Sequence, residues 1–304
     1  MEYLRIENDF PRFSNSAVTL GKFDGVHRGH RKLVDKVLER KEDGAQAVIF
    51  AFETKSKQLF EKKERAKYLE SLGVDILLEC PLNEKMKHMK AENFVKEILV
   101  GDLAVSYVAV GEDFRFGHER KGTPDMLKEF GVKYGFEVEI LPKEMEGRRK
   151  VSSTYIREEL KYGNMEKVAR LLGRNFSVDG EIVHGKGLGH KKLFPTINMI
   201  PSVDKLMPPN GVYLTISKFA EKCYCGVTNV GYKPTVGEAF LGVETYLFGC
   251  DEDLYGRECS VEFLKFQRPE QKFSSVEALK KQLEKDIREA ENYFAETEKN
   301  SLQK

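Results

Sequence analysis

Two patterns of hydrophobic and polar residues divide this chain into unlike halves. In the first half, short apolar runs typical of β-strands alternate with segments in which apolar residues recur at helical spacing. The runs cover residues 17–20, 46–52, 75–80, 106–110 and 136–141. Such alternation is typical of parallel strands joined by helical crossovers. We therefore predict a doubly wound α/β domain whose ligands bind beyond the carboxyl ends of the strands.

From about residue 173 the helical pattern gives way to strand-like runs separated by turn-rich segments. These runs cover residues 176–184, 211–219, 222–230, 243–250 and 259–266. They predict an antiparallel sheet or small barrel, so we divide the chain into domains 1–172 and 173–304, after a predicted helix at 165–172. A last helix follows a capping box at 274–277, and we interpret its single apolar stripe as core packing: Val276, Leu279, Leu283, Ile287, Ala290 and Phe294.

Composition narrows the classes of partner. The 304 residues suffice for two domains, and 50 Lys and Arg against 49 Asp and Glu produce no net field that would attract nucleic acid or an anionic membrane. No apolar run approaches the roughly 20 residues of a membrane span, and the first residues lack the order of a signal peptide. Five scattered cysteines argue against a disulfide framework. We expect a cytoplasmic protein without nucleic-acid or membrane partners, with weak self-association left open.

The segment richest in chemical groups follows the first predicted strand, where residues 21–30 read G-K-F-D-G-V-H-R-G-H. Helical spacing of apolar residues begins just after it, so His27 and His30 lie where a strand turns into a helix. The first N–H groups of a helix lack partners and its dipole is positive there, so this turn favours a bound anion. Glycines at positions 21, 25 and 29 allow close approach of a ligand. The four residues H-R-G-H alone would also fit a chance pair of surface histidines.

Two further segments carry polar groups at the ends of predicted elements. Residues 111–117 read G-E-D-F-R-F-G directly after a predicted strand, which is typical of a ligand-contacting loop but also of a plain turn. Residues 151–157 read V-S-S-T-Y-I-R before a helical pattern. There the hydroxyls can cap the helix while Arg157 projects one turn further in, where it could bind phosphate. A simple cap with a surface arginine is the alternative.

In this order the three segments resemble the signatures of the adenylyltransferase half of bacterial bifunctional riboflavin kinase/FAD synthetases, within the superfamily that activates ATP through an H-x-G-H turn. The resemblance implies a Rossmann-like nucleotidyltransferase domain that joins FMN to the α-phosphorus of ATP and expels pyrophosphate. His27, His30 and Arg157 would be catalytic, stabilising charge on the phosphorus and the leaving group. It also implies nucleotide contacts from Gly21, Phe23, Asp24, Gly25, Ser153 and Thr154, and flavin contacts from Asp113, Phe114 and Phe116.

The strand-rich half has its own polar positions. Residues 185–190, G-K-G-L-G-H, form a basic glycine-rich loop that is weak evidence alone. In the run F-P-T-I-N at 194–198, Thr196 and Asn198 point the same way if the segment is extended, and their oxygens suit Mg²⁺. A turn followed by a short edge strand is the alternative. Glu244 is a carboxylate in an otherwise apolar strand. Buried, it would suit a general base, whereas an outward-facing surface glutamate is the alternative.

These segments resemble the P-T-x-N, N-x-G-x-x-P-T, V-E-x-[HY] and F-x-R-P-E motifs of riboflavin kinases; here the last two are residues 243–246 and 266–270. The resemblance implies an antiparallel six-stranded β-barrel with a terminal helix. In it, Glu244 would accept the proton of the terminal ribityl hydroxyl of riboflavin during attack on the γ-phosphorus of ATP. Nucleotide contacts would come from Gly185, Gly187, Thr196 and Asn198, the last two also holding Mg²⁺, and flavin contacts from Arg268 and Glu270.

The leading hypothesis is therefore a bifunctional enzyme that uses ATP to make FMN and then FAD. The chain departs from the family after the second predicted strand, where T-F-x-P-x-P is common and residues 50–56 read F-A-F-E-T-K-S. A riboflavin kinase with a degenerate adenylyltransferase domain is one alternative. A flavin-binding regulator without turnover is the other.

Overall fold

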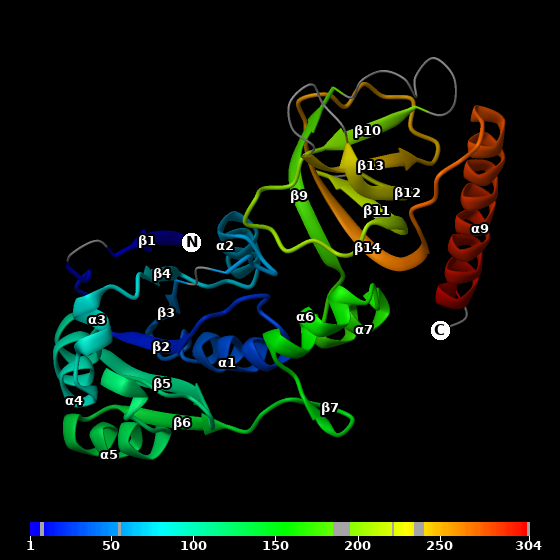
Figure 1. Ribbon diagram of the computed structural model, residues 1–304. Coiled ribbons are helices and arrows are strands. Elements are labelled where there is room, and N and C mark those ends of the chain that lie inside the picture. Colours follow the sequence, from blue (N-terminus) through cyan, green and yellow to red (C-terminus); the bar gives the residue numbers. More distant parts are fainter. Residues whose placement is uncertain (7–8, 54–55, 185–194, 221, 234–239, 303–304) are drawn as a thin grey trace. The chain divides into compact units, whose positions relative to one another are not determined.

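The computed structural model describes the chain except residues 7–8, 54–55, 185–194, 221, 234–239 and 303–304 (Figure 1). It contains two compact units, Met1–Ser153 and Thr154–Lys304. The boundary predicted from the sequence lies later, after residue 172, because α6 (Ser153–Lys161) and α7 (Met165–Leu172) continue the helical pattern. From Thr154 on, these helices belong to the second unit, where a Cβ atom at Gly163, between them, would lie 3.2 Å from the ring of Phe266.

The first unit is built on a six-stranded sheet in which every pairing is parallel. In spatial order the strands are β1 (Glu2–Arg5), β4 (Ile76–Cys80), β3 (Gln46–Phe52), β2 (Ser16–Gly21), β5 (Val105–Gly111) and β6 (Glu137–Leu141). This order confirms the α/β prediction. It reverses direction between β2 and β5, and in doubly wound sheets ligands bind at the carboxyl ends of the strands beside that reversal.

Helices cover both faces of this sheet because alternate strand residues face opposite ways. On one face, α1 (Arg28–Glu39) buries Leu33, Val34 and Val37, and α2 (Lys62–Ser71) buries Leu69. Each such side chain contributes about 1.5–3 kcal/mol when fully buried. The other face is covered by α3 (Glu84–His88), α4 (Ala91–Asn93), a π-helical segment (Phe94–Asp102) and α5 (Pro124–Tyr134). A two-stranded hairpin, β7 (Met145–Glu146) and β8 (Arg149–Lys150), ends the unit.

The second unit contains a closed six-stranded antiparallel barrel, which confirms the predicted architecture. Its strands are β9 (Phe176–Val183), β10 (Thr196–Met199), β11 (Gly211–Phe219), β12 (Lys222–Lys233), β13 (Phe240–Leu247) and β14 (Glu258–Pro269). The interior is partly polar: the Thr228 hydroxyl bridges those of Thr215 (2.7 Å) and Thr245 (2.8 Å), and all three are fully buried. The terminal helix α9 (Val276–Leu302) packs on the outer wall, where Ala290 contacts Val212, Leu214 and Val227.

Candidate active sites

The first unit has a cavity of about 660 Å³ at the carboxyl ends of β2 and β5. The turn after β2 contributes Gly21, His27 and His30, and the loop after β5 contributes Asp113, Phe114 and Phe116. Ser152 and Ser153 add hydroxyls from the third segment. The fold therefore brings together the three segments that the sequence analysis selected. The lining has more cationic than anionic side chains, which favours binding of a polyanion. The five cations are Lys22, Lys87, Arg115, Arg120 and Lys143, and the three anions are Asp113, Glu119 and Glu144.

The two histidines form one stacked unit at the start of α1. His27 is the N-cap residue, and its Nδ1 accepts a hydrogen bond from the His30 backbone N–H at 3.3 Å. The two rings lie 3.8 Å apart and nearly parallel, and the Phe23 ring packs 4.8 Å from His30. The turn before them contains left-handed backbone at Phe23 (φ 48°) and Val26 (φ 34°), neither of which is glycine. Strain of this kind persists where the surrounding structure enforces it, often at functional sites.

His30 is electrostatically unusual. Its Nδ1 is buried and has no hydrogen-bond partner among the described residues. Burial, and then the proximity of His27, holds the pKa of His30 well below its usual value, so the imidazole is neutral at pH 7. A buried polar atom without a partner costs about 1–3 kcal/mol, which a bound ligand or water can relieve. The arrangement is suited to hydrogen bonding with a phosphate oxygen.

The loop after β5 supplies an aromatic wall. The Phe114 and Phe116 rings stack 5.6 Å apart at 14° and line the cavity together with Phe52. Asp113 is exposed and forms an ion pair with Lys143 at 2.5 Å. The loop ends at Gly117 (φ 71°), where a Cβ atom would lie 2.7 Å from the Ala91 backbone, so only glycine fits.

Other residues predicted to bind nucleotide have structural contacts. The Asp24 carboxylate accepts a hydrogen bond from the Leu59 N–H at 2.9 Å, so Asp24 helps build the turn. Asp24, Phe23 and Gly25 lie in this turn but are not among the described residues that line the cavity. Thr154 is exposed and Arg157 is half-buried, and both lie on α6 in the second unit. Their roles at the phosphates stay predictions.

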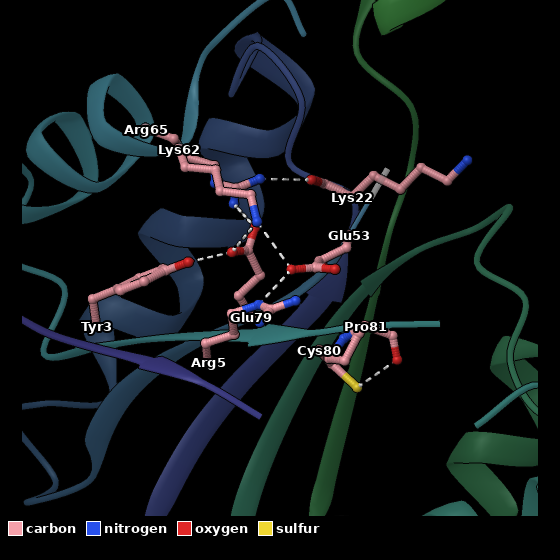
Figure 2. A network of polar contacts seen from close by, with 9 residues as sticks. All are labelled: Tyr3, Arg5, Lys22, Glu53, Lys62, Arg65, Glu79, Cys80 and Pro81. Carbon is pink, nitrogen blue, oxygen red and sulfur yellow. Dashed lines mark hydrogen bonds and ion pairs between the residues drawn. The ribbon is translucent and has the colours of Figure 1, made fainter. Parts of the chain in front are cut away.

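A buried ion network, which the sequence analysis missed, supports the histidine turn (Figure 2). At its centre is Glu79 of β4, only 1% exposed, which receives hydrogen bonds from Arg65 Nη2 (2.5 Å) and the Tyr3 hydroxyl. Lys62 Nζ lies 3.0 Å from the same carboxylate. Arg65 Nη1 in turn donates to the backbone oxygen of Lys22 at 3.4 Å. The network thus ties α2 and β4 to the turn that carries both histidines.

Charge balance keeps this network ionised. Burial opposes ionisation of Glu79, but the hydrogen bonds from Tyr3 and Lys62 and the charge of Arg65 lower its pKa below the usual value. Glu53, which follows β3, accepts hydrogen bonds from Arg5 and Lys62, both at 2.9 Å. Glu53 lies in the segment 50–56, where the sequence departs from the T-F-x-P-x-P pattern, and its carboxylate is held there by two cations. The next two residues, 54 and 55, lie outside the described part of the chain.

The second unit has a cavity of about 720 Å³ between the outer barrel wall and α9. The barrel contributes Thr196, Asn229, Glu244 and Tyr246, whereas the helix contributes Leu279, Leu283 and Ile287. Three members of the apolar stripe therefore line a cavity, and Val276 is 56% exposed. The interpretation of the whole stripe as core packing was wrong, because the helix covers the barrel wall only toward its later turns.

Polar residues of three neighbouring strands meet on this wall. The Thr196 hydroxyl donates to Glu244 Oε1 at 2.7 Å. In the strand register, Glu244 lies opposite Asn198 on one side and Asn229 on the other, so the three share a face. Glu244 is half-buried. Asn229 was not among the predicted site residues, although its place in the N-x-G-x-x-P-T segment could have indicated it.

The donor set here fits a hard divalent cation. Within the described residues, no group of three or more His, Cys, Asp or Glu side chains could hold a metal ion. The Thr196 hydroxyl and the Asn198 amide are oxygen donors on one face of an extended strand, as predicted. Mg²⁺ prefers oxygen ligands and keeps several of its waters beside phosphates, so few protein donors suffice.

The remaining kinase-half predictions have different outcomes. Arg268 lines the cavity, but its guanidinium forms a bidentate pair with the buried Asp286 of α9, Nε to Oδ1 at 2.9 Å and Nη2 to Oδ2 at 2.6 Å. Glu270 also lines the cavity and accepts a hydrogen bond from Asn210 at 3.1 Å. Flavin contacts by both stay predictions. Gly185 and Gly187 lie outside the described residues.

Comparison with known proteins covers both halves of the chain. Residues 10–155 match the family model for FAD synthetase, and residues 172–294 match the model for riboflavin kinase. The bifunctional riboflavin kinase/FMN adenylyltransferase of Buchnera aphidicola is 37% identical, over 92% of this chain and 95% of its own length. The Escherichia coli K12 protein of the same name is 35% identical, over 92% and 93%.

A solved structure shares the entire fold. A crystal structure described as a macrolide-efflux protein from Streptococcus pneumoniae aligns with a TM-score of 0.86 and 27% identity, over 96% of this chain and 99% of that one. In the described part of the present chain, every helix is too short or too polar to cross a membrane.

Proposed function

The chain belongs to the family of bifunctional riboflavin kinases/FMN adenylyltransferases, and from this premise we propose that it phosphorylates riboflavin to FMN and adenylylates FMN to FAD, with ATP in both reactions. The observation that carries the proposal is the presence of two unlike cavities, one in each unit. One is lined by stacked histidines at the end of parallel strands, and the other by Thr196, Asn229 and Glu244 on a barrel wall.

In the barrel unit, Glu244 is the general base of the kinase reaction. It accepts the proton of the terminal ribityl hydroxyl while that oxygen attacks the γ-phosphorus of ATP and ADP leaves. The hydrogen bond from Thr196 orients the carboxylate before the substrate arrives. Thr196 and Asn198 would hold Mg²⁺, which when bound neutralises charge on the phosphates. The apolar side chains of α9 that line the cavity bind the flavin ring.

In the parallel-sheet unit, no protein nucleophile is required. A phosphate oxygen of FMN attacks the α-phosphorus of ATP, and the bond to pyrophosphate breaks. His27 and His30, at the N-terminus of α1, stabilise the charge that develops on the phosphoryl oxygens, as preorganised donors and helix N-termini do. The neutral His30 does so by hydrogen bonding. Phe114 and Phe116 form the wall against which the planar flavin packs.

Separation of the flavins formed from riboflavin, ATP and Mg²⁺ tests the proposal. The wild-type chain forms FMN first and FAD later. Glu244→Gln abolishes FMN formation but still adenylylates supplied FMN, whereas His30→Ala makes FMN and no FAD. Accumulation of FMN with no FAD in the wild type would favour the kinase-only alternative, and no turnover would favour the regulator. Loss of both activities in either folded variant would contradict separate sites.

A cytoplasmic location and weak self-association stay predictions. Cell fractionation tests the first and analytical ultracentrifugation the second.

A further inference from the structure

A strap, residues 144–153, crosses the histidine turn and forms one wall of the first cavity. It comprises Glu144, the β7–β8 hairpin and the segment through Ser153, and four of its residues line the cavity: Glu144, Val151, Ser152 and Ser153. The Val151 N–H donates to the Glu144 backbone oxygen at 2.8 Å, so the two ends of the hairpin are held together. The position of the serine hydroxyls therefore depends on where the hairpin is held.

The histidine turn holds the strap at both ends. At one end, Arg28 extends Nη1 to Glu146 Oε2 at 2.9 Å and Nη2 to Glu144 Oε1, and Lys32 also pairs with Glu144. At the other end, the Ser153 hydroxyl donates to the Asp24 backbone oxygen at 2.8 Å. The strap is therefore attached to the turn on both sides of His27, at Asp24 and at Arg28.

The contacts at the Arg28 end are close and partly shielded from water. The Glu144 and Glu146 side chains are 13% and 18% exposed, and that of Arg28 is 36% exposed. Hydrogen bonds between ionised groups are about twice as strong as neutral ones, and a guanidinium can reach two carboxylates at once. There is also little free space: a Cβ atom at Gly29 would lie 3.6 Å from Glu144 Cβ and 3.3 Å from His27 Nδ1. Movement of the strap would therefore change the surroundings of His27.

Resting on the proposed adenylyltransferase activity, we propose that Arg28 is a positioning residue for adenylyl transfer: through Glu144 and Glu146 it holds the strap so that Ser152 and Ser153 face the phosphates of ATP beside the histidines. Arg28 is not among the described residues that line the cavity, so it acts through the strap. Arg28 stands at the variable position x of the H-x-G-H motif. Its loss slows the transfer step more than it weakens ATP binding.

Steady-state kinetics of FAD formation from FMN and ATP test the role of Arg28. We expect Arg28→Met to lower kcat by about 10- to 100-fold, since misplacement of a site by about 1 Å can cost on the order of 100-fold. The KM for ATP stays nearly unchanged. Arg28→Lys retains the charge but cannot reach both carboxylates, so it recovers only part of kcat. Glu146→Gln has a smaller effect, and adding it to Arg28→Met costs little more, because both changes break the same contact.

The matched control is Arg31→Met. Arg31 is a partly exposed arginine on the same turn of the helix, and its Nε pairs with Asp35 at 2.6 Å. The substitution leaves kcat for FAD formation unchanged. A raised KM for ATP at unchanged kcat would show that Arg28 only attracts the nucleotide, and would overturn the proposal. Additive losses in the double variant, or an equal loss in Arg31→Met, would also overturn it. If Arg28→Met does not fold, Arg28→Lys and Glu146→Gln decide the question, and absence of FAD formation in the wild type would refute the proposed function instead.

Discussion

Arg65→Met should lower the stability of the first unit by an amount that the contacts of Arg65 allow us to calculate. It leaves Glu79, 1% exposed, without its closest charged partner, and it removes the hydrogen bond to the Lys22 backbone oxygen. Breaking a buried ion pair from one side costs about 3–5 kcal/mol. For a unit of this size each kcal/mol lowers Tm by about 2–4 °C, so we expect a fall of roughly 6–20 °C. FAD formation, which depends on the histidine turn, should fail at correspondingly lower temperatures.

The assay heats the full chain briefly at a series of temperatures and then measures both activities at 25 °C. Adenylylation of FMN reports on the first unit, and phosphorylation of riboflavin reports on the second as an internal control. Lys62→Met is the matched variant, because Lys62 reaches the same carboxylate but its side chain is 43% exposed; we expect a cost of about 0–1 kcal/mol. Equal effects of the two substitutions, or equal loss of both activities in Arg65→Met, would refute the reasoning.

Three further predictions follow from the described contacts. The pKa of Glu79 is lower in the folded chain than its usual value of about 4.3, so the carboxylate contributes fully to stability above about pH 4.3, and this contribution is lost as the pH falls through the folded pKa. Urea titrations below pH 5 should therefore show that the free energy of unfolding depends less on pH in Glu79→Gln than in the wild type. Gly29→Ala brings a methyl group to 3.3 Å from His27 Nδ1, so kcat for FAD formation should fall while FMN formation is unchanged in the same flavin assay. Arg268→Met leaves Asp286 buried without its bidentate partner at a cost of about 3–5 kcal/mol, and fluorescence titration should show weaker riboflavin binding as α9 loosens from the barrel.

Local patterns predicted most of the strands and several of the residues that line the two cavities. The strands β3 and β11 and the helix α7 have the predicted bounds, because apolar spacing and turn residues act over a few positions. The motifs after β2 and β5 lie at one cavity because parallel strands end at the same edge of a sheet. β1 was not predicted, since its four residues are mostly polar and it forms only as an edge strand beside β4.

The amino-acid sequence by itself determined the fold class, the two activities implied by the family resemblance and the residues available at each site. Only the tertiary structure decided which partners those residues have: the Asp24 carboxylate accepts a hydrogen bond from the Leu59 N–H, and Arg268 pairs with Asp286. It also decided that Glu79 is ionised in the core, since its partner Tyr3 is 76 positions away along the chain. The physical reason is that a motif specifies which groups are present, whereas the direction and charge of a side chain depend on partners that only packing brings within hydrogen-bond distance.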